Sequence, residues 1–153
     1  EFGLLLRHAT LAYGVSANTI VADVAQAYAK HRDAVLPRVE QRLNEMLTNY
    51  VLDHVFAHWY TNASNLGVYV RGTILRVAFL RFLVFAHPDI RALAEKTEQD
   101  EQEARATVER VLVEIVFKLT RDIDHHGPFL AMLDRVLPAA MPGLEHALTL
   151  LKL

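Results

Sequence analysis

The sequence predicts an all-α fold, a single helical bundle of about six or seven helices around one central apolar helix. Two observations predict this fold. Apolar residues recur along most of the chain at the spacing of one helix face. The second half of Gly67–Ala86, in addition, is apolar at nearly every position. A helix that is apolar almost all round is one that other elements surround, so we expect this segment at the centre.

Two other interpretations of Gly67–Ala86 are weaker. A membrane-spanning helix needs about 20 consecutive apolar residues with few charges. The apolar run is shorter than that, and Arg76 and Arg81 interrupt it. A buried β-strand usually ends after about 8 residues, so the length of the run also favours a helix. No membrane span is therefore predicted.

The composition limits the class of protein. The chain has 153 residues, of which 52% are hydrophobic and 22% are charged, as expected for one globular domain. The formal net charge is -2, and basic residues are scattered among acidic ones, so we expect no nucleic-acid partner. The absence of cysteine excludes disulfides, zinc–thiolate sites, an iron–sulfur cluster held by this chain and a cysteine nucleophile. Because the sequence opens without methionine, we expect a piece of a longer protein.

The first part of the chain predicts three helices. A short first helix ends at Gly14, a residue type that commonly terminates helices, and a second helix runs to about His31. Pro37 suits the first turn of a third helix, which ends near Tyr60. The stripe that this third helix is expected to bury consists of Val39, Leu43, Met46, Leu47, Tyr50, His54, Ala57 and His58.

The central helix has clear start and stop signals. The loop Thr61–Asn65 precedes it, and Asn65 is a candidate N-cap. His87-Pro88 ends it, because proline disfavours helical geometry in the residue before it. A short helical turn is expected at Asp89–Leu93.

The last part of the chain predicts one long helix and two short ones. Acidic residues in Glu98–Glu103 suit the start of a helix that continues to about Asp124, and Gly127-Pro128 breaks it. Shorter helices are expected at Phe129–Leu137 and Leu144–Leu151. The apolar stripe of the long helix consists of Val108, Val111, Leu112, Ile115, Val116 and Leu119.

His54 and His58 form the first cluster that could carry chemistry. Their i, i+4 spacing places two imidazoles on one helix face, as a metal site requires. The sequence supplies no third or fourth ligand at a suitable spacing. Because His54 belongs to the apolar stripe of its helix, we interpret it as a core-facing histidine satisfied by a hydrogen bond, and we predict no metal site.

The second cluster lies in Arg121–Gly127, where Asp124 stands beside His125 near a predicted helix end. A carboxylate next to an imidazole can orient it as a base. Arginine and histidine at a helix C-terminus also stabilise the helix dipole, which is a purely structural explanation. No glycine-rich phosphate loop and no serine-nucleophile motif is present.

Two segments on either side of the central helix carry a family pattern. In Leu43–Tyr60, three residues fit a motif that reads Glu-Asn-Tyr-Leu, then a few residues, then Phe. The matching residues are Asn49, Tyr50 and Phe56. Two positions depart from this motif, since Glu and Leu are replaced by Thr48 and Val51.

The later segment, Val116–Leu133, fits a second motif that reads Phe-Ser-Arg, then two residues, then Glu-His. The residues at its positions are Leu119, Thr120, Arg121, Asp124 and His125. Of these, only Arg121 and His125 are identical to the motif. Taken together, the two segments resemble the flagellin lysine-N-methylase family over roughly residues 40 to 137.

This resemblance implies a cytoplasmic bacterial enzyme that methylates lysine side chains of flagellin with S-adenosylmethionine as donor. The family carries a cysteine-rich N-terminal segment suggestive of an iron–sulfur cluster, so this chain would be the C-terminal helical part. Such a part would have no turnover alone, and would support the active part or dock the protein substrate. The shared polar residues, which either serve the site or tie two helices together, would be Asn49, Tyr50, Arg121, Asp124 and His125.

Two alternatives remain open. The segment Phe85–Glu95 with the central helix also resembles the effector-binding and dimerisation domain of TetR-type repressors, which implies an internal apolar cavity and a two-fold homodimer. A helical protein-interaction module without a pocket is the third interpretation. The methylase resemblance differs from both, because it predicts that Arg121 and His125 approach Asn49 or Tyr50 across helices.

Overall fold

The computed structural model describes residues 2–16, 21–58, 63, 65–95, 101–121, 145 and 148. Within these residues the chain is helical and contains no strand, which confirms the all-α prediction. The helices are α1 (Phe2–Tyr13), α2 (Val21–His58), α3 (Leu66–Ala86), α4 (Pro88–Glu95) and α5 (Glu101–Leu119). The two short helices predicted after residue 128 lie outside the described residues, so the number of six or seven helices stays a prediction.

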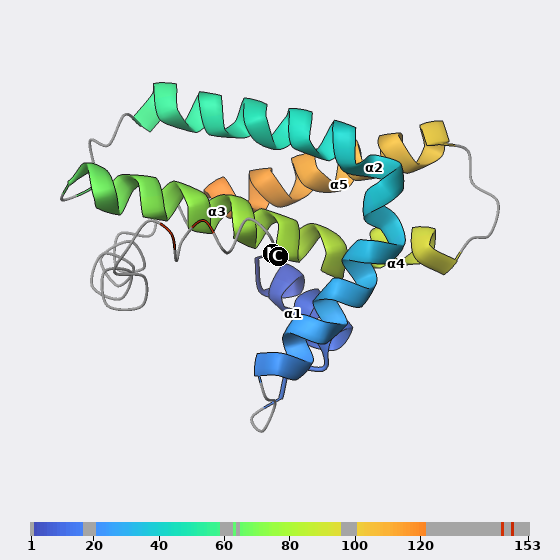
Figure 1. Cartoon of the computed structure of the whole chain (residues 1–153). Helices are drawn as coiled ribbons and strands as arrows, with labels where there is room; N and C mark the ends of the chain where they lie inside the picture. Colours follow the sequence, from blue (N-terminus) through green and yellow to red (C-terminus); the bar gives the residue numbers. More distant parts are fainter. Residues whose placement is uncertain are drawn as a thin grey trace.

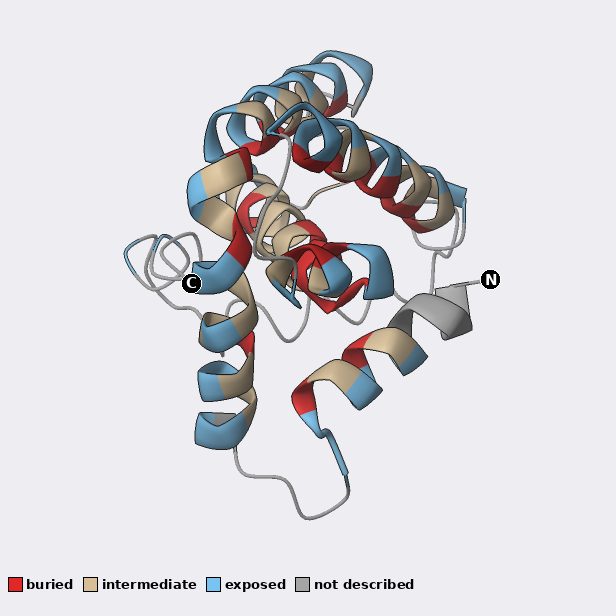
Figure 2. Cartoon of the chain, turned by 90° about the vertical axis from the view of Figure 1, so that its right-hand side faces the viewer, coloured by how far each residue is buried: buried red, intermediate tan, exposed pale blue. Residues whose placement is uncertain are grey.

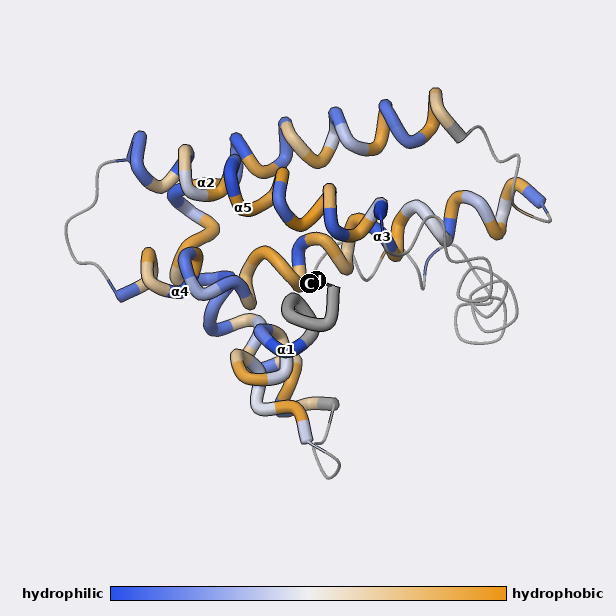
Figure 3. The backbone as a smooth tube through the Cα atoms, turned by 180° about the vertical axis from the view of Figure 1, so that it is seen from behind, coloured by the Kyte–Doolittle hydropathy of each residue, from blue (hydrophilic) through white to orange (hydrophobic). Residues whose placement is uncertain are grey.

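Three long segments lie side by side in the bundle. The second part of α2 and the whole of α5 run in the same direction, and α3 lies along both (Figure 1). The short α4 follows α3 at one end of the bundle (Figure 1). Helix α1 packs against the first part of α2 and the last part of α3 (Figure 1). The apolar sides of these helices point toward one another (Figure 3).

The prediction of two separate helices before Tyr60 was wrong. The sequence suggested two helices, one ending near His31 and another beginning at Pro37, whereas the structure has one helix with Pro37 inside it. An internal proline loses one helical hydrogen bond and bends the helix, and α2 is visibly bent (Figure 1). Val35 and Val39 on either side of Pro37 are fully buried. Burial of this apolar stripe offsets the local cost of proline, so the helix continues.

The core joins the five helices of the described residues. The buried positions face inward on every helix, whereas the outer faces are exposed (Figure 2). The end of α3 is the most enclosed part of that helix, because Leu80 and Leu83–Ala86 are buried while most of its first half is only half-buried. Helix α3 is therefore enclosed mainly in its last two turns, and its role as the central helix stays a prediction. The predicted stripe of α5 is confirmed as buried at Val108, Val111, Leu112, Ile115 and Leu119.

The signals at Gly14, Asn65 and His87-Pro88 are confirmed, whereas the predicted stop at Gly127-Pro128 lies outside the described residues. The Asn65 side chain accepts a 3.0 Å hydrogen bond from the Val68 N–H and so caps α3. Gly14 has a φ of 64°, and the Val15 N–H donates to the Thr10 carbonyl at 3.0 Å. This is the hydrogen-bond pattern of a Schellman motif, which satisfies a carbonyl at the end of α1.

None of the described helices combines the length and the apolar character that a membrane-spanning helix requires.

Candidate functional site

A surface groove between α2 and α5 is the candidate functional site. Its volume is about 510 Å³. The side chains that line it are Met46, Asn49, Tyr50, Asp53, Leu112, Val113, Val116, Phe117 and Thr120. Two of the apolar ones remain largely exposed, since Val113 retains 60% and Phe117 63% of its accessible surface. The groove is therefore open to solvent and mostly apolar.

The α2 wall follows from the helical repeat. Met46, Asn49, Tyr50 and Asp53 are separated by three or four residues, so they lie on one face of α2. Met46 and Tyr50 are half-buried at the base of this wall, whereas Asn49 and Asp53 are exposed at its rim. An amide and a carboxylate therefore border a groove with an apolar floor.

The α5 wall also follows from the helical repeat. Leu112 and Val116 continue from the buried stripe of α5 and form the floor of the groove. Val113 and Phe117, one residue further along, turn outward and form the rim. Helix α5 is thus apolar on a face wider than the one that the core covers, and the excess apolar surface borders the groove.

An ion pair joins α2 and α5 one helical turn before the groove. Arg42 Nε of α2 lies 2.6 Å from Glu109 Oε1 of α5, and Arg42 also bonds Glu45 at 3.1 Å. These hydrogen bonds raise the pKa of the Arg42 guanidinium and lower the pKa of the Glu45 carboxyl. Arg42 and Glu109 each precede the groove by one helical turn on their own helix. The pair therefore links α2 to α5 beside the groove.

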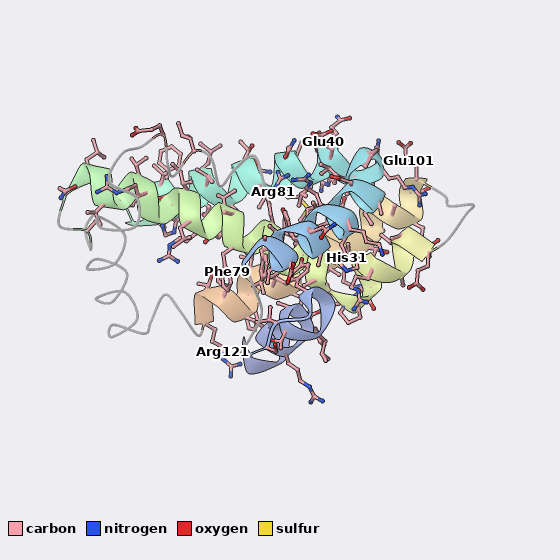
Figure 4. All side chains as sticks on the ribbon, turned by 60° about the horizontal axis from the view of Figure 1, so that its bottom comes forward. His31, Glu40, Phe79, Arg81, Glu101 and Arg121 are labelled. Atoms are coloured by element: carbon pink, nitrogen blue, oxygen red, sulfur yellow. The ribbon has the colours of Figure 1, made fainter. Side chains whose placement is uncertain are left out.

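The structure brings the two segments of the family resemblance to this groove. Asn49 and Tyr50 come from the first segment and Thr120 comes from the second. Arg121 directly follows Thr120 and is exposed at the end of α5 (Figure 4). Asp124 and His125 lie outside the described residues. The two segments thus meet at this groove through Asn49, Tyr50 and Thr120, whereas the predicted approach of Arg121 and His125 to Asn49 or Tyr50 stays a prediction.

The predicted histidine pair is His54 and His58, and His54 does not line this groove. The His54 ring is buried and stacks between two tyrosine rings, at 6.0 Å from Tyr50 of α2 and 6.1 Å from Tyr69 of α3. His58 ends α2, and its side chain lies outside the described residues. Among the side chains that the structure does describe, no three His, Cys, Asp or Glu residues are grouped as a metal site would require. His54 serves the α2–α3 contact, as its place on the apolar stripe indicated.

Sequence reasoning missed the exposed rim residues Val113 and Phe117. The available signal was that α5 carries apolar residues on positions adjacent to its buried stripe. One helix considered alone does not show which of its apolar residues a neighbouring helix will cover. That information comes from the pairing of α5 with α2.

Comparison with known protein families, curated proteins and solved structures finds no match for this chain.

Proposed function

We propose that this chain is a protein-docking domain that receives an amphipathic helix of a protein partner in the groove between α2 and α5. The observation that carries the proposal is the exposure of Val113 and Phe117 beside an apolar floor. Exposed apolar side chains that border a groove are typical of helix-in-groove recognition. Burying them removes apolar surface from water at about 25 cal/mol per Å², which favours association.

The charge at the rim specifies the partner further. Asp53 is exposed at the edge of the apolar groove, and Asn49 lies one turn before it on the same face. A carboxylate in this position favours a lysine or arginine that flanks the apolar stripe of the incoming helix. The proposed occupant is thus an amphipathic helix with an apolar stripe over Phe117 and a basic residue next to Asp53.

The methylase resemblance gives this domain its proposed setting. We infer that the chain is the C-terminal helical part of a flagellin lysine-N-methylase-like protein, and that the groove docks the protein substrate. The support is that Asn49, Tyr50 and Thr120 from both resembling segments line one groove. S-adenosylmethionine and an iron–sulfur cluster would belong to other parts of that protein. The open groove suits a protein segment, whereas the small effector of a TetR-type domain would occupy an internal cavity.

Binding of a designed helical peptide tests the docking proposal. The probe carries leucines at helical spacing and one lysine, and a second peptide has glutamate in place of that lysine. We expect the lysine peptide to bind more tightly than the glutamate peptide, and Asp53→Asn to remove most of this preference. Phe117→Asp should weaken binding at least about tenfold, equivalent to about 1.4 kcal/mol.

A remote apolar residue supplies the matched control. Leu11 of α1 is exposed at 68% and lies outside the groove, so Leu11→Asp should leave peptide binding unchanged. Equal binding by wild type and Phe117→Asp would show that the groove is not the docking site. Sedimentation of the free protein adds a second test, because a dimer disrupted by Phe117→Asp would identify a second copy of the chain as the occupant. Purified flagellin that binds only through the groove would support the methylase setting.

A further inference from the structure

His87 occupies the corner between α3 and α4 and is 7% exposed. Its backbone N–H donates to the Val84 carbonyl at 3.1 Å, which ends α3. Its own carbonyl accepts from the Arg91 N–H at 3.0 Å, which starts α4. Its ring Nδ1 accepts a hydrogen bond of 3.3 Å from the Asp89 N–H. The imidazole is therefore the side-chain N-cap of α4, a position usually taken by Ser, Thr, Asp or Asn.

An imidazole can serve as this cap only when it is neutral. A ring nitrogen that accepts a hydrogen bond carries no proton, so the proton must reside on Nε2. A second proton would turn Nδ1 into a donor facing the Asp89 N–H. It would also place a positive charge at the N-terminus of α4, where the helix dipole is already positive. Protonation of His87 thus removes the cap and opposes the dipole.

Helix α1 adds a second histidine at the same corner. The His8 ring contacts the His87 ring edge-to-face, with 5.6 Å between centroids. The His8 Nδ1 atom is buried, and within the described part of the chain it has no hydrogen-bond partner. A positive charge on His87 would therefore face a second titratable imidazole, and a charge on both rings would make them repel each other.

The acidic groups that face His87 are already engaged with cations. Asp89 Oδ2 of α4 lies 4.0 Å from His87 Nδ1, but it accepts a 2.6 Å hydrogen bond from Arg110 of α5. Glu114 of α5 accepts a 2.6 Å hydrogen bond from Lys118. Each of these two carboxylates is thus already paired with a cationic side chain.

We propose that His87 is an acid-sensitive joint, and that protonation of its ring on mild acidification loosens the corner where α1, α4 and α5 meet. This inference is independent of the docking groove, because neither His87 nor the residues that face it line that groove. The joint would make the packing of α1 and the start of α4 depend on pH in the range in which histidine titrates.

The direction of the pH dependence follows from the charges at the corner. Burial lowers the pKa of His87, and His8 and Arg110 act in the same direction, while Asp89 and Glu114 oppose them. Because the folded pKa lies below the unfolded value of about 6.5, the unfolded chain binds the proton first. Stability is therefore complete above the unfolded pKa and falls as the pH decreases toward the folded pKa.

Two measurements on the intact chain test the joint. Histidine ring signals in an NMR titration give the pKa of His87, and we expect it below the values of exposed histidines. Amide hydrogen exchange at about pH 7 and about pH 5 reports local opening, and we expect protection to fall several-fold in α1 and at the start of α4. A normal or raised His87 pKa would overturn the proposal without the need for any variant.

Asparagine provides the decisive variant, because it caps helices well and does not titrate. At about pH 7, His87→Asn should keep the amide protection of α1 and α4. At about pH 5, the protection in this variant should fall much less than it does in the wild type. His31→Asn is the matched control, since His31 Nε2 lies 3.2 Å from the Ala12 carbonyl of α1 and protonation leaves it a donor. It should keep the wild-type pH dependence at the corner. An unchanged pH dependence in His87→Asn would assign the effect to another group and overturn the proposal.

Discussion

Arg42 Nε on α2 and Glu109 Oε1 on α5 lie 2.6 Å apart, and this pair joins the two helices one turn before the groove begins. Helices α2 and α5 run in the same direction, so no short connection between them sets their alignment (Figure 1). Their relative position depends instead on buried side chains and on this pair. The pair thus connects the packing of the bundle to the shape of the candidate site.

The first prediction concerns the energy of the Arg42–Glu109 pair. Both side chains are more than one third exposed, so water and salt screen their attraction. We expect Glu109→Gln to lower the urea midpoint only slightly, and we expect the difference from wild type to disappear at about 1 M salt. Glu40→Gln, at an exposed position of α2, is the control. A large, salt-independent loss would contradict the exposed character of the pair.

The second prediction separates the two faces of α5. Ile115 is fully buried, and truncation of such a side chain leaves a cavity as well as lost apolar contacts. Ile115→Ala should therefore lower the free energy of unfolding by about 2–5 kcal/mol. Val113→Ala on the exposed face should change it by less than about 0.5 kcal/mol. Urea denaturation measures both, and equal losses would mean that Val113 is covered in solution.

The third prediction concerns the start of α3. The Asn65 side chain caps this helix by accepting from the Val68 N–H. Asn65→Ala leaves that donor to water and should cost about 1 kcal/mol, whereas Asn65→Asp should retain the cap. Thermal unfolding of the two variants checks the assignment. If both variants lose the same stability, the cap hydrogen bond does not contribute.

The fourth prediction concerns the charge next to His87. The hydrogen bond from Arg110 holds the pKa of Asp89 below its ordinary value, so this pair stabilises the fold above the unfolded pKa of about 3.9. That stabilisation is lost as the pH falls through the folded pKa. Arg110→Gln should raise the Asp89 pKa toward its ordinary value and make acid unfolding less steep.

Arg110→Gln should also act on His87. Arg110 lowers the pKa of His87, so the removal of Arg110 should raise that pKa. An NMR titration of the histidine ring signals measures this change. Arg105→Gln is a suitable control, because Arg105 forms an ion pair with Glu101 on the exposed first turn of α5 instead. A variant that shifts neither pKa would show that Arg110 is not held at this corner in solution.

Much of the fold follows from the sequence, because helical periodicity is a local property. The spacing of Val108, Val111, Leu112, Ile115 and Leu119 predicts the buried face of α5 without knowledge of its neighbours. Asn65 and Gly14 are local signals of the same kind. Pro37 misled the prediction, since its local preference for a helix start was outweighed by burial of Val35 and Val39.

The candidate site was less accessible to sequence reasoning. Asn49 and Tyr50 were identified through a family resemblance, but the groove exists because one particular face of α2 meets α5. The role of His87 was also hidden, because a histidine before proline indicates only the end of a helix. Its ring becomes a cap through its tautomer and through its contact with His8 of α1. Such properties depend on tertiary contacts that no local pattern contains.

The last prediction concerns the attachment of α1. The Tyr13 hydroxyl donates a 2.7 Å hydrogen bond to the Phe82 carbonyl of α3, and the two rings lie 4.5 Å apart. Tyr13→Phe keeps the ring contacts but removes the donor, and should cost about 1 kcal/mol. Tyr13→Ala removes both and should cost about 3–5 kcal/mol. Because burial raises the pKa of Tyr13, its hydroxyl should also stay protonated in alkaline solution until the protein unfolds, which ultraviolet titration detects. If Tyr13→Phe leaves the stability unchanged and every tyrosine titrates ordinarily, α1 is detached from α3 in solution.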